Sequence, residues 1–182
     1  KRQIEEYEMM LDESTIWLVR LQGVGYANAE EMVDAGVSGP NVRAAGVNYD
    51  IRWAHPYSVY DEIDWEPAVE KPTSVKGADC YDRYRVRIEE MRQSCRMVLD
   101  AIEKIPGGKN TNYASGDEMI FTKAPTRAPE GATGFSNYEC TRGASQFYIQ
   151  GGGEGRGKMP YRLSIRSPMF LSLIHISEPT RL

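Results

Sequence analysis

Glu139 and Arg142 place a carboxylate and a guanidinium three residues apart, and Gly143 follows directly. At the end of a strand, such residues typically form an ion pair that contributes little energy. The guanidinium can instead stabilise an anion or raise the potential of a nearby redox centre through its positive charge. The spacing alone favours the ion pair, with the electrostatic role as the alternative.

Three cysteines, Cys80, Cys95 and Cys140, are the other candidates for chemistry. None has CxxC spacing, so they predict neither a disulfide framework nor a complete zinc site. Cys80 and Cys95 fall on an apolar stripe, where a free cysteine typically packs as a small hydrophobe. Residues 152–158 match the phosphate-loop pattern GxxxxGK. Because neither a hydroxyl residue nor a helix follows them, they predict a hairpin loop instead.

The composition limits the class of protein. The chain has 182 residues with 22 basic and 26 acidic side chains, which gives a net charge of −4. Nucleic-acid binders usually carry an excess of basic residues, so this charge argues against that class. No apolar run approaches the roughly 18 residues that span a membrane. A globular protein is expected.

Both ends of the chain are expected to lie outside the fold. The opening residues 1–3, KRQ, and the final residues 171–182, LSLIHISEPTRL, match translations of a common transposase sequencing adapter. Such segments are set aside in reasoning about a fold. We therefore expect residues 4–170 to be an internal fragment of a larger subunit. They contain one histidine, His55, which excludes a histidine-based metal cluster or catalytic triad within them.

Several short elements precede the middle of the chain. Apolar spacing predicts a helix over residues 4–20, with Gly23 ending it. Asn28 is the expected N-cap of a second helix, over residues 29–36, with Glu31 completing a capping box. Residues 38–40, Ser-Gly-Pro, predict a turn. Residues 41–63 show no clear period and are expected to be irregular.

The strongest helical pattern covers residues 80–104. Apolar side chains recur along it every three or four residues, at Cys80, Tyr84, Ile88, Met91, Cys95, Val98 and Ile102. Asp79 is the expected N-cap, and Pro106 and Gly107 mark the end. At roughly 1.5–3 kcal/mol for each large side chain buried, this stripe must face a core. No other expected element is long enough to cover it fully, so part of its partner is expected to be missing.

Strand signals follow a loop over residues 107–137, which by its length is expected to be functional or bound by a partner. Polar and apolar residues alternate over 146–150 and 161–166, and the glycine-rich residues 151–157 link them. This pattern predicts an antiparallel hairpin, to which residues 138–141 add a third strand. The expected fold class is therefore α+β, with long helices and a small antiparallel sheet near the C-terminus.

Ordered motifs along the chain resemble a known family. They are SGP with Arg43 and Gly46, DIR at 50–52, PYSVY at 56–60, GADCYDRY at 77–84, EEMRQS at 89–94 and PYRLSIRSP at 160–168. Together they are similar to the 49-kDa-type (D) component of NADH:quinone oxidoreductase, which is respiratory complex I. The likeness covers nearly all of residues 4–170 and corresponds to the second half of that protein. Within these motifs, the residues expected to have a structural role are Asp79, Cys80, Asp82, Arg83 and Arg92.

The resemblance implies a peripheral subunit on the cytoplasmic face of a prokaryotic cell membrane. With a small iron–sulfur partner subunit, it would form a quinone-headgroup pocket beside the partner's cluster. The complex would oxidise NAD(P)H elsewhere and couple electron transfer to quinone with proton translocation, with other peripheral-arm and membrane-arm subunits as partners. Quinone is then the implied substrate. The chain itself would hold no metal or covalent cofactor and would bind no nucleic acid.

In that family the strand-entry motif reads Glu-Ala-Pro-Arg/Lys-Gly-Glu, whereas residues 139–144 here read ECTRGA. Glu139, Arg142 and Gly143 match, so the resemblance implies that these three lie near the quinone and the cluster. The headgroup-binding His and Tyr of the family fall outside the matching half, so no catalytic residue is assigned here. Two alternatives stay open: the large subunit of a membrane-bound nickel–iron hydrogenase, and a scaffold subunit of an F420H2- or ferredoxin-dependent relative.

Overall fold

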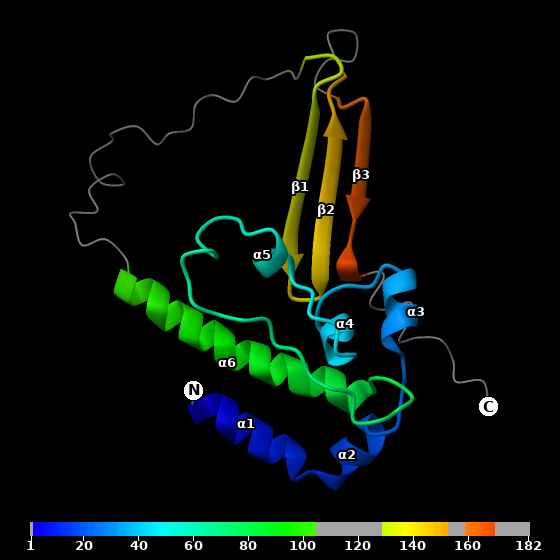
Figure 1. The fold of residues 1–182 in the computed structure, drawn as a ribbon, viewed down its shortest axis with the longest axis vertical. Coiled ribbons are helices and arrows are strands. Elements are labelled where there is room, and N and C mark those ends of the chain that lie inside the picture. Colours follow the sequence, from blue (N-terminus) through cyan, green and yellow to red (C-terminus); the bar gives the residue numbers. More distant parts are fainter. Residues whose placement is uncertain (1, 105–128, 153–158, 170–182) are drawn as a thin grey trace.

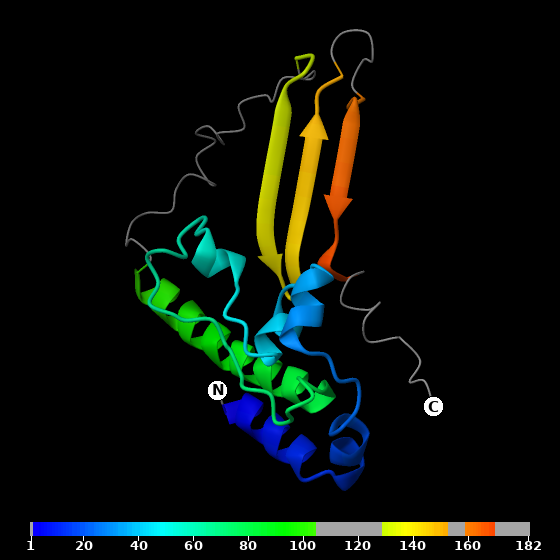
Figure 2. The ribbon, with the colours of Figure 1, turned by 45° about the vertical axis from the view of Figure 1, so that its right-hand side comes forward.

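The computed structural model describes residues 2–104, 129–152 and 159–169. The helices of these residues are α1 (Arg2–Asp12), α2 (Thr15–Leu21), α3 (Ala29–Asp34), α4 (Pro40–Ala44), α5 (Ile51–Ala54) and α6 (Cys80–Lys104). The strands are β1 (Thr133–Cys140), β2 (Gly143–Gln150) and β3 (Arg162–Arg166). In Figures 1 and 2 the sheet stands at one end of the molecule, α6 runs past its base, and α1 lies along α6 on the side away from the sheet. The expected α+β class is confirmed.

The single helix predicted over residues 4–20 is wrong, because the chain breaks at Ser14. The Ser14 backbone is extended, with φ −80° and ψ 103°, and its side chain accepts a hydrogen bond from the Trp17 N–H at 3.4 Å. Serine is among the best N-cap residues, so it starts α2 as a separate helix. The capping box predicted at α3 is confirmed, since Asn28 and Glu31 each accept the other's backbone N–H.

Residues 41–63, expected to be irregular, contain two short helices instead. The predicted Ser-Gly-Pro turn is the entry to α4, with Pro40 at its first position, where a missing N–H costs nothing. The Asp50 carboxylate caps α5 by accepting the Arg52 N–H at 2.9 Å. Helices of four or five residues complete little more than one turn, so no apolar period becomes visible in the sequence.

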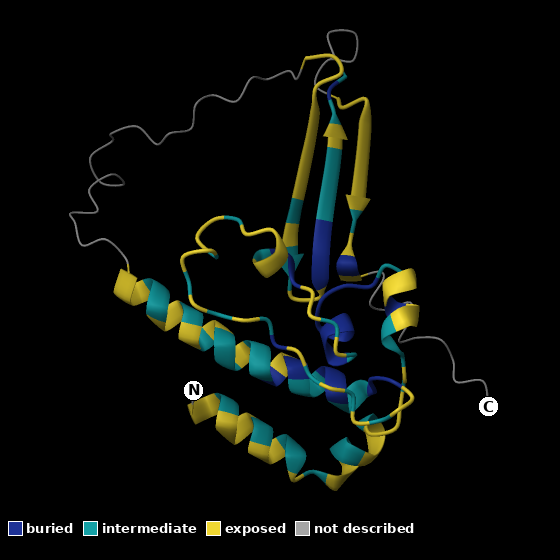
Figure 3. Cartoon of the chain, in the orientation of Figure 1, coloured by how far each residue is buried: buried dark blue, intermediate teal, exposed yellow. Residues whose placement is uncertain are grey.

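The long helix α6 begins as predicted. Asp79 accepts the Asp82 N–H at 2.9 Å, and Asp82 accepts the Asp79 N–H at 3.2 Å, which forms a reciprocal cap. Its first half is buried around Val86, whereas Val98 and Ile102 in its second half are 57% and 60% exposed (Figure 3). This exposure agrees with the expectation that no element among the described residues covers the whole stripe. Residues 106 and 107, expected to end the helix, lie outside the described residues.

The three strands form an antiparallel sheet in the order β1-β2-β3. Cys140 pairs with Gly143 at the tight turn between β1 and β2, and Gln146 pairs with Arg166 on β3. The predicted hairpin is confirmed. The third strand begins at Thr133 rather than at Tyr138, so residues 133–137, expected to be loop, are strand. Residues 105–128, 153–158 and 170–182 lie outside the described part, including the expected adapter-derived tail.

The buried core lies where α4 meets the first half of α6. One small cluster at this junction consists of Ala44, Ala68, Ala78 and Val86. A second, of Met32, Val37 and Val42, joins α3 to α4. Figure 3 shows that burial is concentrated at this junction and at the start of β2. Within the described residues, no helix has both the length and the apolar character needed to cross a membrane.

Candidate functional site

The turn between β1 and β2 is held against the entry to α4 by two glycines. Gly39 has φ 79° and Gly143 has φ 124°, and a Cβ on Gly39 would lie 2.4 Å from Gly143 Cα. Side chains do not fit this backbone contact, and both φ values lie in the range that favours glycine. Ser38 Oγ completes the contact by accepting the Ala144 N–H at 2.9 Å. Close backbone packing against the entry to α4 therefore explains why position 143 is a glycine.

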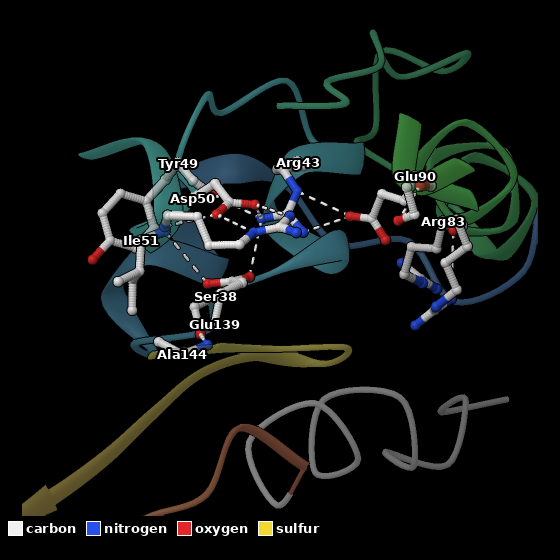
Figure 4. A network of polar contacts seen from close by, with 12 residues as sticks. Ser38, Arg43, Tyr49, Asp50, Ile51, Arg83, Glu90, Glu139 and Ala144 are labelled. Carbon is white, nitrogen blue, oxygen red and sulfur yellow. Dashed lines mark hydrogen bonds and ion pairs between the residues drawn. The ribbon is translucent and has the colours of Figure 1, made fainter. Parts of the chain in front are cut away.

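A buried charge cluster lies beside this contact (Figure 4). The Arg43 guanidinium, 2% exposed, contacts three carboxylates that come from different elements. Its Nη1 lies 3.1 Å from both Asp50 Oδ2 and Glu139 Oε1, and its Nη2 lies 2.5 Å from Glu90 Oε1. Because a buried charge without a partner is costly, these contacts tie α4, α5, α6 and β1 together.

A second guanidinium adjoins the cluster. Arg52 binds Asp50 in a two-point pair, with Nη2 2.7 Å from Oδ2 and Nε 3.0 Å from Oδ1. Its guanidinium carbon also lies 4.7 Å from the Trp65 ring centre and 5.6 Å from that of Tyr60, which is cation–π geometry. Asp50 is thus shared between Arg43 and Arg52, the bidentate pair being the stronger.

Glu139 sits in this cluster with few hydrogen-bond donors. Arg43 Nη1 donates to Oε1, while Oε2 faces the Ile51 N–H at 3.5 Å. Burial raises the pKa of the Glu139 carboxyl and Asp50 raises it further, whereas Arg43 lowers it, and the net direction is upward. The local ion pair between Glu139 and Arg142, which the spacing favoured, is not formed, because Glu139 pairs with Arg43 instead.

A cavity of about 780 Å³ opens between α1, α6 and the β1–β2 turn. Its apolar lining includes Ile4, Tyr7, Tyr84, Ile88 and Met91, and Glu139 and Arg142 contribute polar groups from the turn. Cys95 and Cys140 line it as well. Cavities of this size and character are typical of small-molecule sites.

Four arginines line this cavity, and two of them, Arg43 and Arg52, are paired in the charge cluster. The other two, Arg142 in the turn and Arg87 on α6, form no ion pair among the described residues. Burial lowers the pKa of Arg87, Glu90 raises it, and the positive charges of Arg83 and Arg142 lower it, with a net downward direction. The two guanidiniums therefore leave a net positive charge on the cavity wall.

The structural-motif residues of α6 lie away from this cavity. Asp79 Oδ2 accepts the Gly23 N–H at 2.9 Å, and Arg83 donates to the Gly25 carbonyl at 2.7 Å and to Cys80 Sγ at 3.1 Å. These contacts hold the start of α6 against the loop that follows α2.

The other two motif residues also make structural contacts. Asp82 accepts the Thr73 N–H through both carboxylate oxygens, at 3.2 and 3.3 Å. Arg92 joins α6 to α1 by an ion pair with Glu8. No group of His, Cys, Asp and Glu able to hold a metal ion is found among the described residues.

The sequence pointed to Glu139, Arg142 and Gly143, and the structure brings these three together with α4. Spacing missed the partners Arg43, Asp50 and Glu90, because Arg43 and Glu139 are 96 residues apart. The sequence did contain one indication of a buried ion pair, because Arg43 is a charged residue in a segment otherwise apolar enough to be buried.

The fold and this site can now be set beside known proteins. The family model of the respiratory-chain NADH dehydrogenase 49-kDa subunit matches residues 1–181, and the chain belongs to this family. A D-type component of the NADH-quinone oxidoreductase of Thermodesulfovibrio yellowstonii is 39% identical over 199 residues, which cover 98% of this chain and 47% of the relative.

Two further relatives agree. A D-type component of the NADH-quinone oxidoreductase of Chloroherpeton thalassium is 37% identical, over 95% of this chain and 41% of the relative. The H-type component of the NAD(P)H-quinone oxidoreductase of a Synechococcus species is 34% identical, over 93% of this chain and 45% of the relative. The chain therefore spans less than half the length of these relatives.

Proposed function

We propose that the chain is part of the quinone-site subunit of a membrane-associated NADH:quinone oxidoreductase of the complex I type. The family assignment supports the class of complex. The assignment of a quinone site rests on one observation, which is the cavity with Arg142 in its wall. In this proposal the subunit lies on the cytoplasmic face of the membrane, and a small iron–sulfur subunit beside it holds the cluster that reduces quinone.

The cavity fits the chemistry of a quinone headgroup, which is a flat apolar ring with carbonyl oxygens. Its volume of about 780 Å³ accommodates such a ring, and its apolar side chains contact the ring faces. The Tyr84 hydroxyl is buried without a hydrogen-bond partner among the described residues, and it supplies a donor at this wall. Burial chiefly raises the pKa of Tyr84 to about 12, so the hydroxyl keeps its proton at neutral pH.

Arg142 has the electrostatic role in this proposal. Two-electron reduction places negative charge on the quinone oxygens, and a guanidinium at the cavity wall stabilises that charge. Arg87 adds a second positive charge from α6. NAD(P)H oxidation and proton translocation take place in other subunits of the same complex.

Photolabelling of the assembled complex tests the site. A photoreactive quinone analogue should label peptides from residues 84–95 and 141–142, and excess quinone should suppress the labelling. Labels confined to other segments or other subunits would refute the assignment. Such a result would favour the scaffold alternative, in which this subunit holds its iron–sulfur partner without contacting quinone.

Substitution of Arg142 tests its role. Arg142→Met should lower the quinone reduction rate about tenfold, a value below the roughly 10²-fold effect of a fully buried donor because Arg142 is exposed. Arg142→Lys should keep part of the rate, since it keeps the charge. Arg96→Met is the matched control, because Arg96 is 61% exposed and outside the cavity lining. Equal rates for Arg142→Met and Arg96→Met would contradict the electrostatic role.

A further inference from the structure

The charge cluster around Arg43 is unbalanced. It contains two guanidiniums, Arg43 and Arg52, and three carboxylates, Asp50, Glu90 and Glu139. With every group ionised, these five side chains carry one net negative charge, and the further positive charge of Arg87 acts on Glu90, the partly exposed member. Asp50 is 0% and Glu139 3% exposed, so solvent does little to stabilise that charge. A buried uncompensated charge is costly, and binding one proton removes it.

Hydrogen bonds and burial together identify the carboxylate that is least satisfied. The two Nη1 hydrogens of Arg43 are donated to the Tyr49 carbonyl and to Glu139 Oε1, both at 3.1 Å. Asp50 receives Arg52 at both oxygens, and Glu90 receives Arg43 from two nitrogens. Glu139 Oε2 has only the long contact with the Ile51 N–H, at 3.5 Å, among the described residues. Both Arg43 bonds to Glu90 end on Oε1, and Glu90 Oε2 is open to water because the side chain is 21% exposed. Of the two fully buried carboxylates, Glu139 is therefore the one where an added proton costs fewer hydrogen bonds.

Glu139 is also the buried carboxylate of the cluster that reaches the cavity. Glu139, Glu90 and Arg43 line the cavity wall, whereas Asp50 does not. Glu90 is 21% exposed, so its charge is partly solvated. The Tyr57 hydroxyl is fixed beside Glu139, where it accepts the Glu139 backbone N–H at 3.2 Å. The positive charges of Arg87 and Arg142 lie on the same wall.

We propose that the Arg43 cluster binds one exchangeable proton on Glu139 and delivers it to a ligand in the cavity. The upward direction of the Glu139 pKa, caused first by burial, agrees with this assignment. Binding of the proton follows from the cluster alone. Delivery rests on the proposed function: electrons come from the partner's iron–sulfur cluster, the Glu139 O–H bond breaks, and a bond from that proton to an anionic oxygen of the reduced quinone forms. Glu139 is left as a carboxylate and takes up a proton again from water.

Infrared spectroscopy of the assembled complex tests the binding of the proton. A band in the carbonyl-stretching region of protonated carboxylic acids should titrate with pH and shift in D₂O. Glu139→Gln should remove this band, whereas Glu89→Gln should keep it, because Glu89 lies on the surface of α6 with Arg92. Asp50→Asn should move the midpoint to lower pH, since it removes the neighbouring negative charge. A spectrum unchanged by Glu139→Gln would overturn the proposal.

The pH profile of quinone reduction tests delivery. Glu139→Gln should lower the rate by about 10²-fold, the lower end for loss of a general acid, and should remove one limb of the profile. Glu139→Asp, which keeps a titratable group, should restore that limb with a shifted midpoint. A rate and profile that Glu139→Gln leaves unchanged would overturn delivery. If the infrared band titrates but the quinone analogue labels other subunits, the proposed function fails while the proton site stands.

Discussion

Replacement of Gly39 by alanine should destabilise the chain far more than the loss of a glycine alone. Gly39 has φ 79° and ψ −152°, a region that only glycine occupies readily. Forcing another residue into such a region costs about 1–3 kcal/mol. The new Cβ would also lie 2.4 Å from Gly143 Cα and 2.8 Å from the Arg142 carbonyl carbon. These are backbone atoms, which cannot rotate away, so overpacking adds about 1–3 kcal/mol.

The expected loss for Gly39→Ala is therefore about 2–6 kcal/mol, a large part of the roughly 5–15 kcal/mol that stabilises a typical domain. Gly131 provides the matched control. Its φ of 76° is nearly the same, yet a Cβ there would meet no atom within 4 Å. Gly131→Ala should lower the free energy of unfolding only by the strain of placing alanine in this backbone conformation, about 1–2 kcal/mol.

Urea unfolding of the wild type and both variants measures these losses of stability. The urea concentration at the midpoint falls in proportion to the free energy of unfolding when the dependence of that free energy on urea is unchanged. The difference between the variants should be about 1–3 kcal/mol, the part caused by the close approach of α4 to the β1–β2 turn. Equal costs, within about 0.5 kcal/mol, would refute the reasoning that this contact requires glycine. A loss in Gly131→Ala larger than in Gly39→Ala would refute it as well.

Four further results are expected. Ser38→Ala should cost about 1–3 kcal/mol in urea unfolding, since it leaves the buried Ala144 N–H without its acceptor. Asp82→Ala should cost a similar amount and make the loop before α6 more sensitive to protease, because Asp82 caps the helix and holds that loop. Val98→Glu should change stability by less than about 0.5 kcal/mol but reduce aggregation, since Val98 is 57% exposed; a larger loss would show that it is buried. Because the pKa of Glu139 is raised in the folded state, stability should fall as pH rises from the ordinary glutamate value through the raised one, and Glu139→Gln should abolish that fall in unfolding measured across pH.

The sequence was informative where structure depends on neighbours along the chain. The caps of α3 and α6 involve residues three apart, and the β2–β3 hairpin has strong alternation on both strands. These patterns report local hydrogen bonds and one-sided burial, so they can be recognised without knowledge of the rest of the fold.

The remaining features depend on contacts between distant segments. The burial of α4 is set by its contact with α6 and the turn, and nothing in its five residues has a helical period. The expected ion pair between Glu139 and Arg142 failed for a similar reason. Arg43 is buried, and a buried guanidinium attracts carboxylates more strongly than an exposed one does. Spacing in the sequence carries no information about which cation will be buried.

The position of Arg142 follows from two independent attachments of the β1–β2 turn. On one side of Arg142, Gly143 contacts the backbone of the segment that begins α4; on the other, Glu139 is bound by Arg43 from the same helix. The turn is therefore fixed at both of its ends by one short buried element, and the Arg142 side chain lies between them at the cavity wall. Because the backbone on both sides of Arg142 is fixed, its charge stays near the cavity, where it can stabilise a developing negative charge. A change at Gly39 should consequently disturb ligand binding as well as stability, although Gly39 does not line the cavity.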